Sequence, residues 1–112
     1  MDVPKAVKNA SVKMKQIKER DRFLAGKGQR FKAGGYWGDK IDWFGDNPGF
    51  RIVGWKLHRP QTGDFLLSKM ESGRTGVFVI SNVKLETNPK DMFFADTLPV
   101  CMEDGELMKI GY

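Results

Sequence analysis

The chain has 112 residues, of which 40% are hydrophobic, 12% aromatic and 29% charged. This length predicts one compact domain, because a shorter half could not bury enough apolar surface to fold alone, and the composition excludes a disordered chain. No apolar run reaches the length of a membrane span, and the N-terminus lacks the apolar core of a secretion signal. We therefore expect a soluble, cytoplasmic protein with no membrane partner.

The net charge of +5 is concentrated near the N-terminus. Residues 1–32 carry ten Lys or Arg against three acidic residues, a net of +7, whereas residues 33–112 have a net of −2. Such an asymmetry indicates an anionic partner for the basic part. The single cysteine, Cys101, cannot form an intramolecular disulfide, which fits a reducing compartment.

Residues 1–24 are predicted to form a basic amphipathic helix that begins at about residue 3. The apolar residues at helical spacing are Val3, Val7, Ala10, Met14, Ile17 and Leu24. Gly26 is a natural stop after the last of them. Because this stripe is narrow, the helix must pack on the rest of the chain, on another copy or on a partner.

Residues 25–49 are predicted to be a structured loop. They contain seven glycines and alternating charges with no sustained period. Tyr36, Trp37, Trp43 and Phe44 are costly to leave in water, so the segment is not a flexible linker. A short helical turn over residues 40–44 is an alternative for that part of the loop.

Residues 50–112 change to short apolar runs with turn signals about every ten residues, a spacing typical of a meandering sheet. The five predicted strands lie within residues 50–59, 65–70, 77–85, 92–102 and 107–112. Five short antiparallel strands most readily close into a small barrel, SH3-like or similar, because closure removes exposed edges. The predicted fold class is therefore α+β, mainly β: a five-stranded antiparallel meander or barrel with an N-terminal helix.

The stretch "SGRTG" at residues 72–76 raises the question of a phosphate-binding loop. It lacks the lysine of a P-loop, and the apolar residues after it predict a strand rather than a helix. A tight turn between two strands explains the glycines better. Arg74 at the tip of this turn could still contact a phosphate or carboxylate through the paired N–H donors of its planar guanidinium group.

Two stretches that include this turn carry a resemblance. The sequences "GDFLLSKMESGRTGVFVI" and "NPKDMFFA", with the closing "GY", resemble short uncharacterised proteins encoded by tailed bacteriophages. The resemblance covers about residues 63–96 and the C-terminus, and leaves the basic helix unmatched. It implies a phage or prophage origin and a small β-rich domain, and it implies no catalytic residue.

Groups for catalysis are few. His58 is the only histidine, so a Ser-His or Cys-His pair would depend on one residue in a predicted strand. One Cys and one His cannot supply a usual zinc site, and Asp39, Asp42 and Asp46 do not have EF-hand spacing. We expect no enzyme activity, no cofactor and no metal; Cys101 is predicted to be an inert core residue.

Nucleic acid is the first partner that the sequence suggests. Basic residues of the helix would track phosphates, and the loop interleaves cations with aromatic rings, as single-stranded nucleic acid requires. The predicted contact residues are Lys5, Lys8, Lys15, Lys18, Arg22, Arg30, Lys32, Tyr36 and Arg74. The first hypothesis is a non-enzymatic binding module, a phage accessory protein acting on nucleic acid or a nucleoprotein complex.

A protein partner is the alternative. Here Val3, Val7, Met14 and Ile17 would dock in a groove of a host factor or of a virion, with the lysines kept in water. The chain would then inhibit a host protein or be a minor structural component of the virion. Self-association through the same stripe also stays open.

Overall fold

The structure, a computed structural model, describes residues 5–36, 39–44, 51–55, 60–70, 72–85 and 92–108. Within these residues the chain is mainly β with one helix. The elements are α1 (Lys5–Leu24), β1 (Arg30–Lys32), β2 (Gly34–Tyr36), β3 (Asp39–Phe44), β4 (Arg51–Trp55), β5 (Phe65–Lys69), β6 (Thr75–Leu85) and β7 (Met92–Met102). At residues 5–11, 35–36, 39–40 and 44 only the backbone is described.

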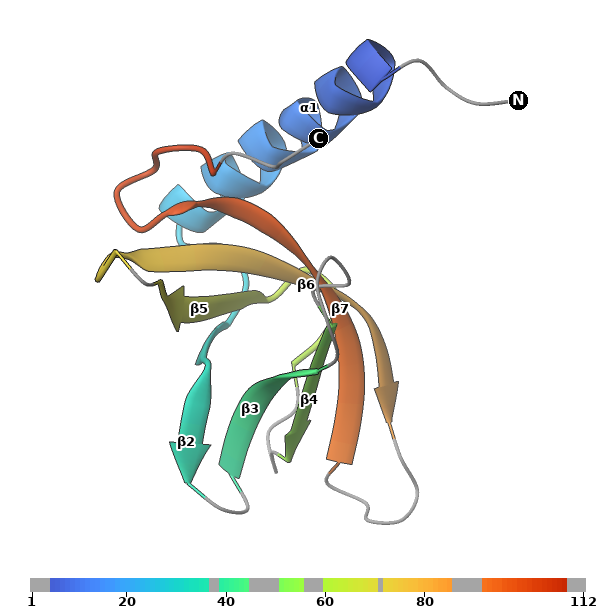
Figure 1. Ribbon diagram of the computed structural model, residues 1–112, viewed down its shortest axis with the longest axis vertical. Helices are drawn as coiled ribbons and strands as arrows, with labels where there is room; N and C mark the ends of the chain where they lie inside the picture. Colours follow the sequence, from blue (N-terminus) through green and yellow to red (C-terminus); the bar gives the residue numbers. More distant parts are fainter. Residues whose placement is uncertain are drawn as a thin grey trace.

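The strands form one strongly curled sheet, a half-barrel in outline (Figure 1). Their order is β1-β5-β6-β7-β4-β3-β2, and every described pair is antiparallel except β1 with β5. The two end strands, β1 and β2, are consecutive in the chain and separated only by Ala33. One bent stretch of chain therefore supplies both edges of the sheet, which must curl for this to happen.

The step between β1 and β2 is constrained by the strands with which they pair. Antiparallel pairing alternates strand direction from β2 across to β5, so β5 runs against β2. Because β1 is parallel to β5 and continues almost directly into β2, strand direction has to rotate across the sheet, and the curl of the sheet and the bends of the long strands β6 and β7 allow this (Figure 1). Gly34 has a φ of +87°, a conformation that residues with a Cβ adopt only at a cost.

Apolar side chains pack on both faces of the sheet. Alternation along β6 places Phe78 and Ile80 on the inner face and Val77 and Val79 on the outer face. The inner cluster contains Phe31, Ile41, Ile52, Leu66, Phe78, Ile80, Phe93, Ala95 and Met108. The outer cluster contains Phe23, Phe65, Val77, Val79, Val100 and Cys101.

Helix α1 covers part of the outer face. It lies across one end of the curled sheet, next to β6 and β7, while the other halves of these strands extend away from it (Figure 1). The helix ends at Leu24 as predicted, in a motif with Gly26 in the left-handed region at φ +80°. The amides of Gly26 and Lys27 donate to the carbonyls of Phe23 and Arg22, respectively, so these two carbonyls of the last helical turn have hydrogen-bond donors.

The mainly β class with an N-terminal helix is confirmed, and the predicted set of five antiparallel strands is wrong. The sheet has seven described strands, or six if β1 and β2 count as one bent strand, and it is mixed because β1 and β5 are parallel. Four of the predicted strands correspond to β4, β5, β6 and β7. Of the fifth, Leu107 forms a bridge with Cys101, and residues 109–112 lie outside the described residues.

The interpretation of residues 25–49 as a loop is also wrong. This segment contains β1, β2 and β3, and the alternative of a helical turn at residues 40–44 falls on a strand. The strands were missed because two of them have only three residues each and because the glycines resembled loop residues. Phe31 and Ile41 are nevertheless buried in the inner cluster, which is what keeps the segment in the sheet.

The stretch at residues 72–76 is a turn followed by a strand, as predicted. It joins the antiparallel strands β5 and β6, with Gly73 at φ +87° and the Met70 amide donating to the Arg74 carbonyl over 2.7 Å. No helix follows it, so it does not have the strand–loop–helix context of a P-loop.

In the described part of the chain, no helix combines the length and hydropathy needed to cross a membrane.

We expect Gly34→Ala to lower the free energy of unfolding by about 1 kcal/mol, because residue 34 has a positive φ in the folded protein. No atom lies within 4 Å of the position that a Cβ would take, so the loss would come from backbone conformation alone. Urea titration would measure it. Gly34→Asn should lose less, since Asn tolerates this region better, and equal stabilities of all three proteins would contradict the argument.

Candidate binding surface on helix α1

A buried glutamine fixes helix α1 on the sheet. The Gln16 side chain is only 4% exposed, and its Nε2 donates to the carbonyl oxygens of Pro99 at 3.0 Å and Met108 at 2.9 Å. Both carbonyls belong to the C-terminal third of the chain, far from the helix in sequence. Because buried carbonyls are costly to leave without donors, this amide sets where α1 lies along β7.

A second anchor lies one to two turns further along α1. The buried Phe23 ring meets the Phe65 ring edge to face, with centroids 5.3 Å apart. Glu19 is also buried and forms an ion pair with Arg22. The Nη2 of Arg22 donates to the Gly63 carbonyl at 3.1 Å, and its guanidinium lies 5.4 Å from the Phe65 ring centroid. Arg22 thus neutralises a buried carboxylate.

Arg30 is engaged at the end of the same helix. Its guanidinium lies 4.2 Å from the centroid of the Phe23 ring, and its Nη2 donates to the Phe23 carbonyl. A cation here meets the negative end of the helix dipole. Arg22 and Arg30 were both predicted to contact nucleic acid, and both guanidinium groups are held by neighbouring parts of the chain.

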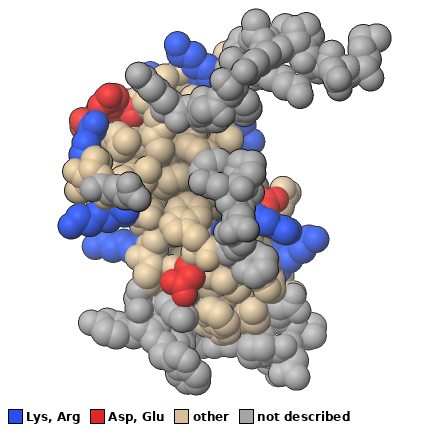
Figure 2. Space-filling model, in the orientation of Figure 1, with Lys and Arg blue, Asp and Glu red and all other residues tan. Residues whose placement is uncertain are grey.

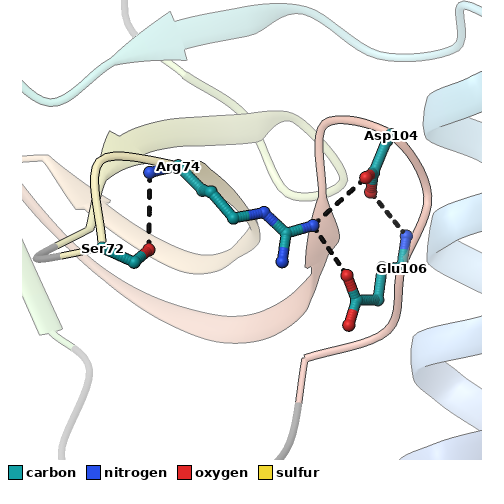
Figure 3. A network of polar contacts seen from close by, with 4 residues as sticks. All are labelled: Ser72, Arg74, Asp104 and Glu106. Carbon is teal, nitrogen blue, oxygen red and sulfur yellow. Dashed lines mark hydrogen bonds and ion pairs between the residues drawn. The ribbon is translucent and has the colours of Figure 1, made fainter.

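Arg74 is held in a network with two carboxylates (Figure 3). Its Nη2 lies 3.1 Å from Asp104 and 2.7 Å from Glu106, and its amide donates to the Ser72 hydroxyl at 3.4 Å. The hydrogen bond to Glu106 raises the pKa of Arg74. The Glu106 amide, followed by the charge of Arg74, lowers the pKa of Asp104. This predicted anion-binding group therefore faces two negative charges.

The lysines of α1 are placed differently. Lys13, Lys15 and Lys18 are exposed and form no ion pair with any described residue. Lys27 and Lys32, beyond the end of the helix, are likewise exposed. On the face drawn in Figure 2, the described Lys and Arg side chains lie in several separate groups. Among the helix residues whose side chains are described, Lys13, Lys15 and Lys18 are therefore the cations available to a partner.

Between residues 12 and 24, where side chains are described, the packed face of α1 differs from the stripe that the sequence suggested. Gln16, Glu19 and Phe23 face the sheet, whereas Met14 is 71% exposed and Leu24 is 56% exposed. The helical spacing of the packed residues was visible in the sequence, but two of them are polar and a search for apolar residues omits them. Ile17 is half-buried beside this face.

Other predicted residues have only a backbone position or none. The backbones of Lys5, Lys8 and Val7 belong to α1, and that of Tyr36 belongs to β2, with no side chain described. Val3, His58 and Asp46 lie outside the described residues. Asp39 and Asp42 are on β3, and no group of three or more candidate metal ligands occurs among the residues that are described.

No family model, curated protein or solved structure matches this chain.

We expect Gln16→Ala to lower the free energy of unfolding by roughly 1–3 kcal/mol, because it leaves two buried carbonyls without their donor. Chemical denaturation followed by tryptophan emission would measure the change. Lys18→Ala, on the exposed side of the same helix, is the matched control and should stay within about 0.5 kcal/mol of the parent protein. A Gln16 variant as stable as this control would show that the amide does not anchor the helix.

Cys101 should react slowly in the folded protein. It is fully buried, and this burial raises the pKa of its thiol to about 11. At pH 8 we expect iodoacetamide to alkylate the native protein about 100-fold more slowly than the urea-unfolded chain, because the thiolate is the nucleophile. Equal rates, followed by mass spectrometry, would contradict the burial of this residue.

The same shift predicts the direction of a pH effect on stability. The unfolded thiol ionises near its ordinary pKa of about 8.5, before the folded thiol does. The contribution of Cys101 to stability is therefore complete below that pH and is lost as the pH rises toward about 11. Cys101→Ala should remove this part of the alkaline destabilisation in denaturation curves measured between these two pH values.

Proposed function

We propose that this protein binds nucleic acid without sequence preference through the lysines of α1. The observation that carries the proposal is the contrast between the two sides of the helix. One side is fixed on the sheet by Gln16 and Phe23. The other presents Lys13, Lys15 and Lys18 to solvent without partners in the described part of the chain.

The charge balance of the helix supports this choice. From residue 12 to residue 24 it carries five basic and two acidic residues, and one of the acidic residues, Glu19, is already paired with Arg22. The resulting positive electrostatic potential attracts a polyanion to the helix, and an affinity that depends on it decreases as the salt concentration rises. Because the sheet holds the helix in place, binding need not order it first.

The role is that of a binding module rather than an enzyme. Phosphate contacts from lysines position a protein on nucleic acid and carry no base information, so no sequence preference is expected. The resemblance of residues 63–96 to phage-encoded proteins favours an accessory factor of a phage. Such a factor would act on nucleic acid or on a nucleoprotein complex in the cytoplasm of the host.

A protein partner is the second candidate, favoured by one specific observation. Met14 and Leu24 are large apolar side chains, yet they are 71% and 56% exposed on the helix. A partner with an apolar groove could cover them, with the neighbouring lysines at the rim. Affinity for such a partner would depend on these two side chains and only weakly on salt.

The triple variant Lys13→Gln, Lys15→Gln and Lys18→Gln tests the first proposal. Titration with a 5′-hydroxyl single-stranded oligonucleotide, followed by anisotropy at several salt concentrations, should show weaker binding. We expect the slope of log K against log salt to become less steep by about two, because single strands release roughly 0.7 counterion per phosphate contact.

A control with the same charge is available on the sheet. Lys69→Gln removes one positive charge from β5, away from the helix, and should leave the slope almost unchanged, whereas each single Lys→Gln variant at residues 13, 15 and 18 should lower it by roughly 0.7. An equal loss in Lys69→Gln would show that the effect depends only on net charge and would contradict the proposal. Absence of oligonucleotide binding by the folded parent protein at low salt would overturn the proposal and favour the protein partner instead.

A further inference from the structure

A hollow lies on the outer face of the sheet, beyond the part that α1 covers. It forms where the pairing of β6 with β7 slips between Ser81 and Lys84. Within this bulge Asn82 has a φ of +51°, the one non-glycine residue with positive φ among those described. The hollow has a volume of about 400 Å³ and is lined by residues of β4, β6 and β7.

A fixed guanidinium lies at one side of the hollow. The Nε of Arg51 is 3.3 Å from Oδ1 of Asp96, and Nδ2 of Asn82 donates to Oδ2 of the same carboxylate at 3.0 Å. Both carboxylate oxygens therefore have partners. The two Nη atoms of Arg51 have none among the described residues, and its side chain is 54% exposed. The bulge directs the Asn82 side chain toward the Asp96 carboxylate, and this carboxylate in turn orients the guanidinium of Arg51.

A second cation lies at the opposite side. On the sheet, β7 lies between β4 and β6; Arg51 is opposite Asp96, and Lys84 is opposite Phe94. The backbones of β4 and β6 are thus about 10 Å apart, twice the spacing of neighbouring strands. Both side chains are long enough to reach an anion between them. Lys84 is exposed and forms no ion pair with a described residue.

The charges favour a doubly charged ligand. The carboxylate of Asp96 is occupied by Arg51 and Asn82, so the hollow as a whole is positive. A planar fork on one side and an ammonium on the other match a phosphate monoester, which has three terminal oxygens and a charge of about −1.5 to −2.

The size and the walls of the hollow indicate what the phosphate is attached to. Its volume is within the range of small-molecule sites, and the half-buried ring of Phe94 gives it an apolar wall between the cations. A flat apolar group can lie against such a wall while its phosphate meets the cations.

We propose that this hollow binds a phosphate monoester attached to a nucleoside, with the phosphate between Arg51 and Lys84. The ligand could be a free mononucleotide or the 5′-phosphorylated end of a strand, which offer the same chemistry. The site is separate from the lysines of α1, and its residues belong to the sheet. It therefore stands or fails independently of the proposed function.

The experiment uses the full ¹⁵N-labelled chain titrated with AMP, adenosine and inorganic phosphate. AMP should shift the amides of residues 82–84 and 94–96, adenosine should not, and inorganic phosphate should bind more weakly than AMP. Arg51→Gln and Lys84→Gln should each weaken AMP binding about tenfold, since each removes a charge-assisted contact. Lys69→Gln, an exposed lysine of β5 outside the hollow, should change it less than about twofold.

The two sources of the phosphate are separated with octathymidylate carrying either a 5′-phosphate or a 5′-hydroxyl. Tighter binding of the 5′-phosphorylated strand, lost in Arg51→Gln, would support the end of a strand. Tighter binding of AMP would support a free nucleotide. The assignment is overturned if AMP shifts no amide of the hollow, if inorganic phosphate binds as tightly as AMP, or if Lys69→Gln weakens binding as much as the two hollow variants.

The signal for this site was present in the sequence but was weak. Asn82 interrupts a run of β-branched and apolar residues in "VFVISNVKL", and an asparagine within a strand pattern indicates a bulge. Arg51 and Asp96 lie more than forty residues apart, and only the pairing of β4 with β7 brings them together.

Discussion

The direct connection between β1 and β2, through Ala33, is the constraint on which the sheet depends. It lets one short stretch of chain pair with β5 on one side and with β3 on the other. Because this stretch pairs with strands at both ends of the strand order, the sheet has to curl back on itself. The curl gives the sheet an inner and an outer face, and α1 packs on the outer one. A positive φ at Gly34 accompanies the connection.

The helix is held by polar contacts as much as by apolar ones, and this decides which of its surfaces a partner can reach. Gln16 satisfies two carbonyls, and Glu19 and Arg22 form a pair at the interface. Such contacts are directional, so they fix the rotation of the helix about its axis more closely than an apolar stripe would. The lysines and the apolar Met14 consequently share the exposed side. That shared surface is why nucleic acid and a protein partner are both chemically reasonable ligands.

The outer face of the sheet is divided along β6 and β7. Where the ladder is regular, Val77 and Val79 lie in the apolar cluster with Phe23 of the helix. Where the ladder slips, the outer face becomes polar and hollow, and the bulge at Asn82 organises charged groups from three strands. The same two long strands thus serve as a packing platform at one end and as a candidate ligand site at the other.

The sequence by itself determined the helix, its end near Gly26, four of the strands and the turn at residues 72–76, because each depends on local periodicity or backbone preference. It also determined the concentration of positive charge in the first third of the chain. Only the tertiary structure decided that residues 25–49 form strands, since strands of three residues exist through their partners rather than through their own pattern. It alone decided which arginines are paired, and it brought Arg51, Lys84 and Asp96 to one hollow. These contacts depend on the pairing of β4 with β7, which are separated in the chain by β5 and β6, and the alternation of side chains within a strand does not specify which distant strand is its neighbour.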